Sequence, residues 1–341
     1  MKVRATVPVS LIVVVVAMGS LISSRAQESS QPAQEIAGDN GQAETKNWAA
    51  GNPLKIALLH WYQANTTTIF DVGNTQNSNP YGVAFDGQNI WTANNGEGTV
   101  TKLRASDGEP LGTFTVGKGP IGVVFDGANI WATNESVNTV TKLRASDGKV
   151  LGTFTVGNSP YWPAFDGRNL WFPNFVDRTV TKLRASDGKN VGTFSTQGAA
   201  IAAAFDGTHV WVTNADASGT VVRFNLDGTI SGKFKVGARP IGVAFDGANI
   251  WVANQSDGTV SKLRASDGKT LGTFNVCCGP YGVAFDGANV WVTVGIALYE
   301  LRASDGKIIG NFNANGGSTG VAFDGANIWV ALSLGNVVHK F

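Results

Sequence analysis

The stretch PIGVVFDGANIWATNESVNTVTKLRASDGKVLGTFTVG, residues 120–157, decides the fold, because close copies of it fill most of the 341-residue chain. A Phe-Asp-Gly triplet marks each copy, and a tryptophan follows six residues after its phenylalanine. The triplets recur in five steps of 40 residues and a last step of 38, beginning at Phe85, Phe125, Phe165, Phe205, Phe245, Phe285 and Phe323. A fixed period of this length is typical of repeat architectures, whose units bury their apolar faces against their neighbours.

Each copy contains four short runs rich in β-branched and aromatic residues, as in 121–125, 129–133, 139–144 and 150–156. The turns between them carry Gly, Asp and Asn, which tolerate the positive φ angles of hairpins. Four strands in about 40 residues, seven times over, predict an all-β, seven-bladed β-propeller across residues 66–341.

The last copy ends at Phe341, one strand short of the others. Residues 66–72, TTTIFDV, match the outermost run of the other copies and stand before the first complete unit. We therefore predict that this N-terminal strand completes the last blade and closes the ring, which leaves no sheet open between the two termini.

The chain begins with features of a secretory signal over residues 1–26: basic residues, an apolar run and a small-residue end, Ser24-Arg25-Ala26. Residues 27–52 are polar and predict a flexible lead-in, and 53–65 predict a short helix that caps the ring. We expect a secreted or periplasmic protein with no transmembrane segment after signal cleavage.

The charge balance excludes a general basic binder, because 26 Lys and Arg face 25 Asp and Glu. We expect no nucleic acid and no cofactor. The expected partner is a small molecule, a glycan, a peptide or an envelope protein, and the expected state is a monomer. The low charge together with 10 tryptophans also excludes a disordered chain.

The repeated motifs VGxxPxGVAFDG, NIWVAN and TVTKLRASDGKVLGTFTVG resemble the YVTN-type β-propellers of secreted bacterial and archaeal proteins, and more distantly the NHL-type propellers. The resemblance covers about residues 66–341. It implies a seven-bladed fold, an extracytoplasmic setting and a binding role, but its motifs specify architecture and no reaction.

The residues that recur in every copy are best explained as scaffold. We expect the triplet aspartates to accept backbone N–H bonds in their turns, and the repeated tryptophans to fill the wedges between blades. We expect local ion pairing and snorkelling for the lysines and arginines of the third strand.

Function is expected where the repeat is broken, on the face that bears the loops into the inner strands. The residue after the loop proline points toward the channel mouth, and it is aromatic at Tyr81, Tyr161 and Tyr281. The third unit departs most, through Trp162, Phe172, Phe175 and Arg178, beside an alanine-rich fourth unit. The pattern predicts a ligand site with a stacking surface, or packing in which Trp162 fills the space that the alanines leave.

A second set of candidates ends the second strand of five units: Asn94, Asn134, Asn174, Asn214 and Asn254. These amides either face a ligand or cap turns. Acids in the adjoining loops could hold Ca²⁺, but no loop has the alternating pattern of a dedicated site, so we predict no metal.

Cys277 and Cys278 are the only cysteines, and they stand in the loop that enters the sixth unit. In an exported protein they pair with each other or stay free. A structural clip, a ligand contact and redox chemistry all remain open for the pair.

We expect a noncatalytic binding or scaffold protein, with its ligand or partner at the top face around the channel. The alternatives are an enzyme resembling streptogramin (virginiamycin B) lyase and a quinoprotein-like redox protein. The lyase chemistry needs a histidine general base at the channel mouth, and His60, His209 and His339 fall elsewhere in the repeat. We therefore predict no catalytic residue.

Overall fold

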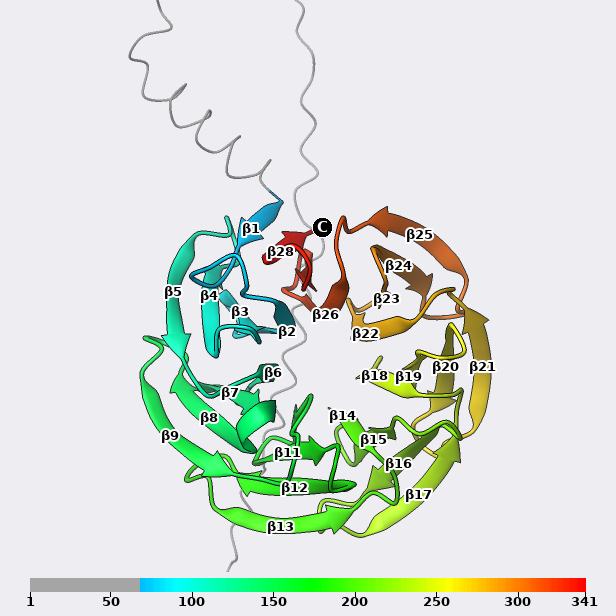
Figure 1. The fold of residues 1–341 in the computed structure, drawn as a ribbon. Coiled ribbons are helices and arrows are strands. Elements are labelled where there is room, and N and C mark those ends of the chain that lie inside the picture. The colour runs from blue at the N-terminus through cyan, green and yellow to red at the C-terminus, as the bar shows by residue number, and fades with distance from the viewer. Residues whose placement is uncertain (1–67) are drawn as a thin grey trace, which may run out of the picture. The chain divides into compact units, whose positions relative to one another are not determined.

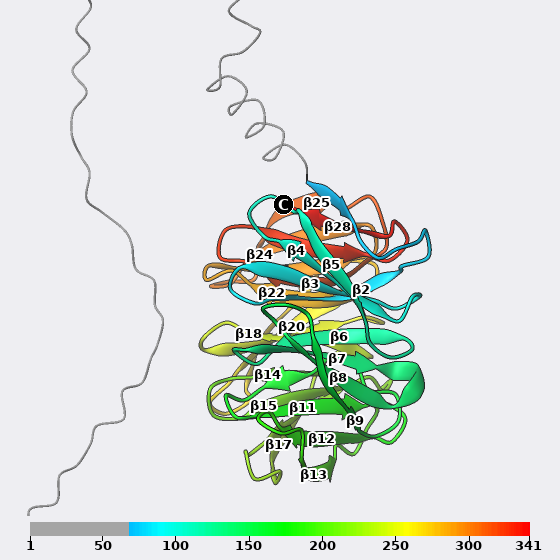
Figure 2. The ribbon, with the colours of Figure 1, turned by 90° about the vertical axis from the view of Figure 1, so that its left-hand side faces the viewer.

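The computed structural model describes residues 68–341, which form seven four-stranded antiparallel sheets arranged in a ring (Figure 1). This arrangement confirms the predicted seven-bladed propeller. Figure 2 shows the ring turned by 90°, with the outer strands of the first blades toward the viewer. The predicted signal segment 1–26, lead-in 27–52 and helix 53–65 lie outside the described residues.

Every blade runs from an inner strand at the channel to an outer strand at the rim. Blade one consists of β2 (Pro80–Phe85), β3 (Asn89–Asn94), β4 (Thr99–Arg104) and β5 (Pro110–Thr115). Blade two consists of β6 (Pro120–Phe125), β7 (Asn129–Asn134), the 3-10 turn η1 (Glu135–Val137), β8 (Thr139–Arg144) and β9 (Val150–Thr155). Blade three consists of β10 (Ala164–Phe165), β11 (Asn169–Asn174), β12 (Thr179–Arg184) and β13 (Asn190–Ser195).

The remaining blades repeat this order. Blade four consists of β14 (Ala200–Phe205), β15 (Val210–Asn214), β16 (Thr220–Phe224) and β17 (Ile230–Lys235). Blade five consists of β18 (Pro240–Phe245), β19 (Asn249–Asn254), β20 (Thr259–Arg264) and β21 (Thr270–Asn275). Blade six consists of β22 (Pro280–Phe285), β23 (Asn289–Val294), β24 (Ala297–Arg302) and β25 (Ile308–Asn313), and blade seven of β26 (Ser318–Phe323), β27 (Ile328–Leu332), β28 (Val337–Lys340) and β1 (Ile69–Asp71).

The ring closes as the sequence predicts, because β1 pairs with β28 and supplies the missing outer strand of blade seven (Figure 1). Ile69 lies opposite His339, and Phe70 opposite Val338. The Phe70 ring lies 5.4 Å from that of Trp329, which repeats the contact between outer-strand phenylalanine and tryptophan seen in the other blades. The strand therefore restores both the hydrogen bonds and the core of blade seven.

The core lies in the wedges between neighbouring blades. Trp91 of blade one is fully buried and packs with Val123, Ile130 and Leu143 of blade two. Trp329 makes the same kind of contact with blade one across the closure. The predicted wedge-filling role of the tryptophans is confirmed.

Each triplet aspartate holds its turn and its tryptophan together. Asp126 accepts the N–H groups of Ala128 and Asn129 at 3.0 and 2.7 Å through one carboxylate oxygen. Its other oxygen accepts the indole N–H of Trp131 at 2.8 Å. The same indole bond occurs in all seven blades, at 2.7 to 2.8 Å. The turn role predicted for these aspartates is confirmed, and the bond to the buried indole extends it.

The third-strand lysines have a different role from the predicted ion pairing. Lys102 is buried, and its ammonium lies 5.2 Å from the centroid of the Trp91 ring. It donates to the carbonyl oxygens of Ala145 and Ser146 in blade two, at 2.7 and 3.2 Å. The ion pairs belong to the arginines, as in Arg104 with Asp107 at 2.7 Å. The prediction was wrong for the lysines because strand alternation alone does not show which next-blade carbonyls come within reach.

In the described part of the chain, no helix is long and apolar enough to cross a membrane.

We expect Asp126→Ala to lower the free energy of unfolding by about 2 to 3 kcal/mol, because it leaves the buried indole N–H of Trp131 without an acceptor and removes the turn bonds. Urea denaturation measures the change. Arg144→Gln, at an exposed ion pair in the same blade, is the control and should change stability within experimental error. Equal losses in the two variants would contradict the role assigned to the aspartate.

We also expect stability to fall in acid. Burial raises the pKa of Asp246 and of Asp324, but hydrogen bonds from their tryptophans and turn amides outweigh it and hold each pKa below its ordinary value. Their stabilisation is therefore present above the unfolded-state pKa, near pH 4, and is lost as the pH falls through the lower folded-state pKa. Urea midpoints measured from pH 7 to pH 3 test this. A flat profile across that range would contradict it.

Candidate functional site

A ring of glycines lies on the inner strands, each one residue after the tyrosine, isoleucine or threonine near the channel mouth. A Cβ at Gly82 would collide with the carbonyl oxygen of Ile121 in the next blade, and one at Gly282 would lie 2.6 Å from the oxygen of Thr319. Neighbouring inner strands therefore approach closely where this residue is glycine. Five blades have it: Gly82, Gly122, Gly242, Gly282 and Gly320.

Blade three has Trp162 in place of this glycine, and its inner strand follows a different path. β10 retains only two residues. Upstream of it, Trp162 donates to the oxygen of Ile201 at 3.1 Å and accepts from the N–H of Ala203 at 3.0 Å, a parallel bridge to blade four. Ala202, at the matching position of blade four, is the partner in this bridge and is buried.

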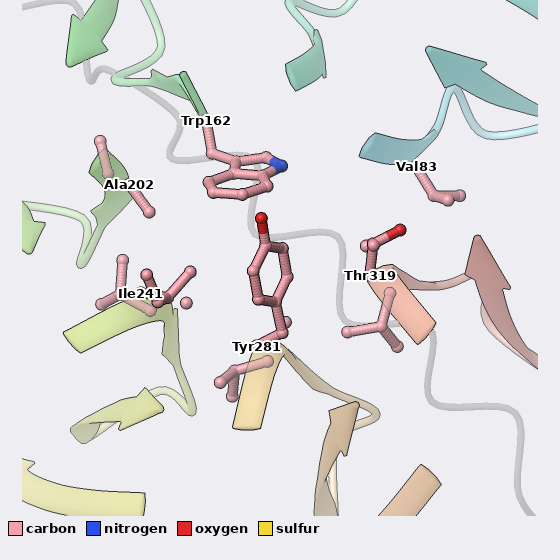
Figure 3. Close-up of a pocket in the computed structure, with 13 residues that line it drawn as sticks. Val83, Trp162, Ala202, Ile241, Tyr281 and Thr319 are labelled. Atoms are coloured by element: carbon pink, nitrogen blue, oxygen red, sulfur yellow. The ribbon is translucent and has the colours of Figure 1, made fainter. Parts of the chain in front are cut away.

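The indole of Trp162 reaches across the channel to blade six. Its ring lies 5.2 Å from that of Tyr281, edge to face at 88°, and the Tyr281 hydroxyl points toward it (Figure 3). Tyr161 lies 5.4 Å from Trp162 and 5.7 Å from Phe175. We call these four residues the aromatic cluster: Tyr161, Trp162, Phe175 and Tyr281. They pack around Ile201, Ala202 and Ile241.

A cavity of about 100 Å³ lies in the channel beside this cluster (Figure 3). Trp162 and Tyr281 border it, and valines of the inner strands, such as Val243 and Val283, line the rest. Most lining side chains are apolar; Trp162, Tyr281 and Thr319 carry polar atoms, and the Thr319 hydroxyl lies within donating distance of the carbonyl oxygens of Pro80, Tyr81 and Ala331. The space suits an apolar or aromatic group rather than a hydrated ion.

Burial controls the protonation of the two cluster tyrosines. It raises the pKa of Tyr281 well above the ordinary value and raises that of Tyr161 as well, with smaller upward effects from other tyrosines and, for Tyr161, from Glu135. Both side chains are therefore neutral hydroxyls near pH 7. Among residues 68–341, neither hydroxyl has a hydrogen-bond partner.

The other aromatic and basic candidates are not members of this cluster, although Tyr81 is near enough to raise the pKa of both Tyr161 and Tyr281. Phe172 is fully buried between blades, 6.2 Å from Trp131, so it belongs to the core. Tyr81 is half-buried at the equivalent ring position of blade one and does not line the cavity. Arg178 is exposed in the hairpin between β11 and β12, at a φ of +57°.

The five asparagine candidates are fully buried behind the loops. Asn134 accepts the N–H of Gly117 at 2.9 Å and donates to Thr139 and Thr141. The other four amides make the same kind of bond to hydroxyls of their own blades: Asn94, Asn174, Asn214 and Asn254. Only Asn134 accepts a loop N–H as a turn cap would; the Oδ1 atoms of the other four accept no hydrogen bond within residues 68–341.

The loop acids hold the entry loops of their blades. Asp257 accepts the N–H of Ala238 at 2.7 Å, and Glu97 accepts those of Asn74 and Thr75 at 2.7 and 2.6 Å. Burial raises the pKa of Glu97, but these bonds outweigh it and keep that pKa below its ordinary value. Within residues 68–341, no three His, Cys, Asp or Glu side chains are grouped to hold a metal.

Cys277 and Cys278 are joined by a disulfide in the exposed loop into blade six. The hairpin beside it, Gly295–Ile296, is too short to carry an acid like those of other blades. In other blades a carboxylate binds the entry loop. Here the loop has instead the disulfide and a hydrogen bond from the Cys277 N–H to the Asn275 side chain. This position fits a structural clip, three residues before Tyr281.

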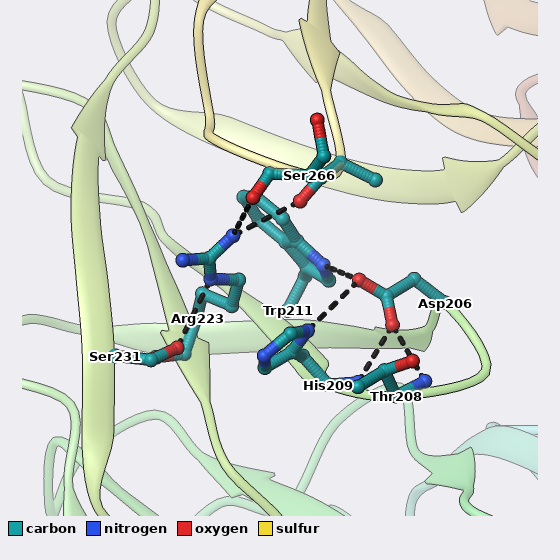
Figure 4. A network of polar contacts seen from close by, with 8 residues as sticks. Asp206, Thr208, His209, Trp211, Arg223, Ser231 and Ser266 are labelled. Carbon is teal, nitrogen blue, oxygen red and sulfur yellow. Dashed lines mark hydrogen bonds and ion pairs between the residues drawn. The ribbon is translucent and has the colours of Figure 1, made fainter.

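The described histidines lie away from the channel mouth. His339 is buried on β28 and packs on Phe341. His209 stands in the hairpin between β14 and β15, on the opposite face, with Nδ1 3.5 Å from the Asp206 carboxylate (Figure 4). A hollow of about 440 Å³ adjoins this hairpin, but Asp206 already holds the Trp211 indole. In the same network, Arg223 stands where other blades have the third-strand lysine. Its guanidinium donates to the carbonyl oxygen of Ala265 in blade five.

No family model matches the sequence, and no curated protein sequence matches it. Solved structures do match its fold. Virginiamycin B lyase from Staphylococcus aureus aligns with a TM-score of 0.69 and 17% identity, over 80% of this chain and 97% of that one. Hydrazine synthase from Kuenenia stuttgartiensis gives 0.70 and 16%, over 79% and 97%. The protein U3-55K gives 0.72 and 14%, over 81% and 98%.

These three matches bear unrelated names, and their low identities show a shared fold alone. The protein is therefore a seven-bladed β-propeller with an aromatic cluster across its channel. Sequence reasoning located Tyr161, Trp162, Phe175 and Tyr281, but not the contact between Trp162 and Tyr281, whose positions are three blades apart.

We expect Trp162→Ala to lower the free energy of unfolding by about 2 kcal/mol, less than truncation of a fully buried tryptophan, because its ring is only partly covered. Trp131→Ala is the comparison, and Val176→Ala, exposed in the same blade, is the control. Urea denaturation measures all three. A loss at Trp162 as large as that at Trp131 would identify its ring as packing rather than as a ligand surface.

Proposed function

We propose that this propeller is an exported, noncatalytic binding protein that takes a small planar ligand at the channel mouth, against the aromatic cluster. The observation that carries the proposal is the contact between Trp162 and Tyr281 across the channel, beside a largely apolar cavity. Aromatic side chains that wall a cavity and keep part of their surface open are typical of sites for flat or apolar groups.

Many polar groups on the rest of the top face are bonded within the protein, but the buried Oδ1 atoms of four asparagines accept no hydrogen bond among the described residues: Asn94, Asn174, Asn214 and Asn254. The asparagines bind hydroxyls, and acids such as Glu97 and Asp257 bind loop N–H groups. The hydroxyls of Tyr161 and Tyr281 lack such partners within the described range. Neither hydroxyl is fully enclosed, so both are open to water or to a ligand.

Export and membership of the YVTN-type propellers are part of the proposal. The signal-like segment 1–26 supports export, and the repeated motifs support the family. The exposed Cys277–Cys278 disulfide is compatible with an oxidising compartment. Secretion of the full-length protein into the medium or periplasm, followed with a C-terminal tag, tests this part.

The competing function is that of an enzyme, either a lyase or a redox protein. The fold match with virginiamycin B lyase is the reason to test for enzyme activity. A histidine base would have to reach the mouth, and neither His209 nor His339 does so. Opening of a streptogramin B ring by the purified protein, read by mass spectrometry, would favour the lyase over a binding protein.

We expect the neutral probe 2-naphthamide to raise the melting temperature of the full-length protein by several degrees at about 100 times its dissociation constant. Trp162→Ala and Tyr281→Ile should weaken its binding at least about tenfold, because each removes an aromatic wall.

Tyr81→Ile is the matched control, since it makes the same change at the equivalent position of blade one and leaves the cluster intact. Isoleucine is native at this position in other blades, as at Ile241. Binding that survives in the cluster variants, or that is absent from the wild type, would contradict the proposal. In the second case, affinity capture of an envelope protein would support the partner alternative.

A further inference from the structure

Blade seven lacks a turn that every other blade has. In blades one to six a short turn joins the third strand to the fourth, as between β8 and β9. The third strand of blade seven, β28, and its fourth, β1, come from opposite ends of the described residues, so no such turn joins them (Figure 1). Blade six is the blade that this missing turn would cover.

In the other blades the turn covers three groups of the preceding blade. In blade two, Ala145 of the turn belongs to the core cluster around Trp91 of blade one. A Cβ at Gly148 of the same turn would collide with the Phe114 ring, so the turn lies directly on that ring. Its carbonyl oxygens accept the ammonium of Lys102.

Blade six has none of this cover among the described residues. Trp291 is partly exposed, whereas the other six repeated tryptophans are fully buried. Phe312 is 38% exposed, whereas the equivalent phenylalanines of the other blades are buried or half-buried. The Phe312 ring lies 5.5 Å from that of Trp291 and 6.2 Å from that of Phe341. We call these three residues the uncovered patch.

The patch also has an acid beside it. Glu300 stands opposite Trp291 in the sheet, at the position of the third-strand lysine. It accepts a hydrogen bond from the Asn289 amide at 2.8 Å and has no ion pair within residues 68–341. Burial, and next the Asp286 carboxylate, raise the pKa of Glu300. Exposed aromatic rings next to an uncompensated acid favour an apolar partner that carries a cation.

We propose that residues 53–65 of this chain dock on the uncovered patch and take the place of the missing turn. The segment leads into β1, which lies beside β28 in blade seven (Figure 1). The turn residue Ala105 stands nine residues before Phe114, and Trp61 stands nine residues before Phe70, the equivalent phenylalanine of blade seven. The chain therefore supplies a large apolar residue where the other blades supply the turn.

The composition of the segment fits the patch. Four of its apolar residues follow the i, i+4, i+7 and i+8 spacing of one helix face: Leu54, Leu58, Trp61 and Tyr62. The segment also carries Lys55, whose charge is opposite to that of Glu300. The inference does not depend on the proposed ligand, because the uncovered patch and the aromatic cluster share no residue.

Digestion of the full-length protein with chymotrypsin tests whether the segment is covered, since this protease cuts after residues such as Trp61 and Tyr62. We expect Phe312→Asp to speed cleavage at these two sites at least about tenfold, because a charge in the patch opposes apolar docking. Leu271→Asp is the matched control. It places the same charge on a similarly exposed residue of the fourth strand in blade five, and should change the rate less than about twofold.

A double-mutant cycle tests the contact without adding a charge. Trp61→Ala and Phe312→Ala should each lower the melting temperature. The loss in the double variant should be smaller than the sum of the two losses by at least about 2 °C, because both changes remove the same contact. Trp61→Ala combined with Leu271→Ala should be additive.

Equal cleavage of the wild type, Phe312→Asp and Leu271→Asp would overturn the inference, and so would additive losses at Trp61 and Phe312. A second copy of the chain is the other candidate for this patch. A wild-type dimer in sedimentation equilibrium that Phe312→Asp dissociates, with no change in cleavage after Trp61 and Tyr62, would assign the patch to that copy and overturn the inference.

Discussion

The bond between each triplet aspartate and its tryptophan holds the propeller together. One carboxylate oxygen fixes the inner turn, and the other accepts the indole N–H, so a local turn determines the position of the largest side chain in the wedge. The indole then packs against the next blade. The carboxylate is thus bonded on both sides, to the backbone of its turn and to the indole.

The third-strand lysine extends this link from one blade to the next. Its ammonium lies over the tryptophan and donates to carbonyl oxygens in the turn between the third and fourth strands of the following blade. Arg223 does so in blade four, and Lys340 crosses the closure to Ala105 and Ser106. Blade six has Glu300 instead, bound to its own Asn289. The following blade takes its outer strand from the N-terminus and so has no such turn, which explains the exception.

The sequence was sufficient for the architecture because periodicity within one chain specifies it. Seven triplets predicted seven blades, and the missing last run predicted the closing strand now seen as β1. Roles that depend on the next blade were harder to predict. The lysine contacts and the loop anchors formed by acids such as Asp257 need the angle between blades. The alternation of inward and outward residues along the strands of one blade gives no information about the angle between blades.

The candidate site was predictable in part, for a related reason. Departures from a repeat can be read directly, so Trp162 and the alanines of blade four stood out. Whether Trp162 packs or binds depends on what lies across the channel, and ring closure brings Tyr281 there from three blades away.

The departures depend on one another physically. A large residue in the glycine ring would collide with its neighbour, and blade three avoids this by shortening β10 and pairing Trp162 with the small Ala202. That change moves the indole into the channel, where Tyr281 and the residues of blade five meet it. Packing alone explains the alanine but not the open face of the indole, which is only partly covered. The planar ligand proposed above would cover that open face.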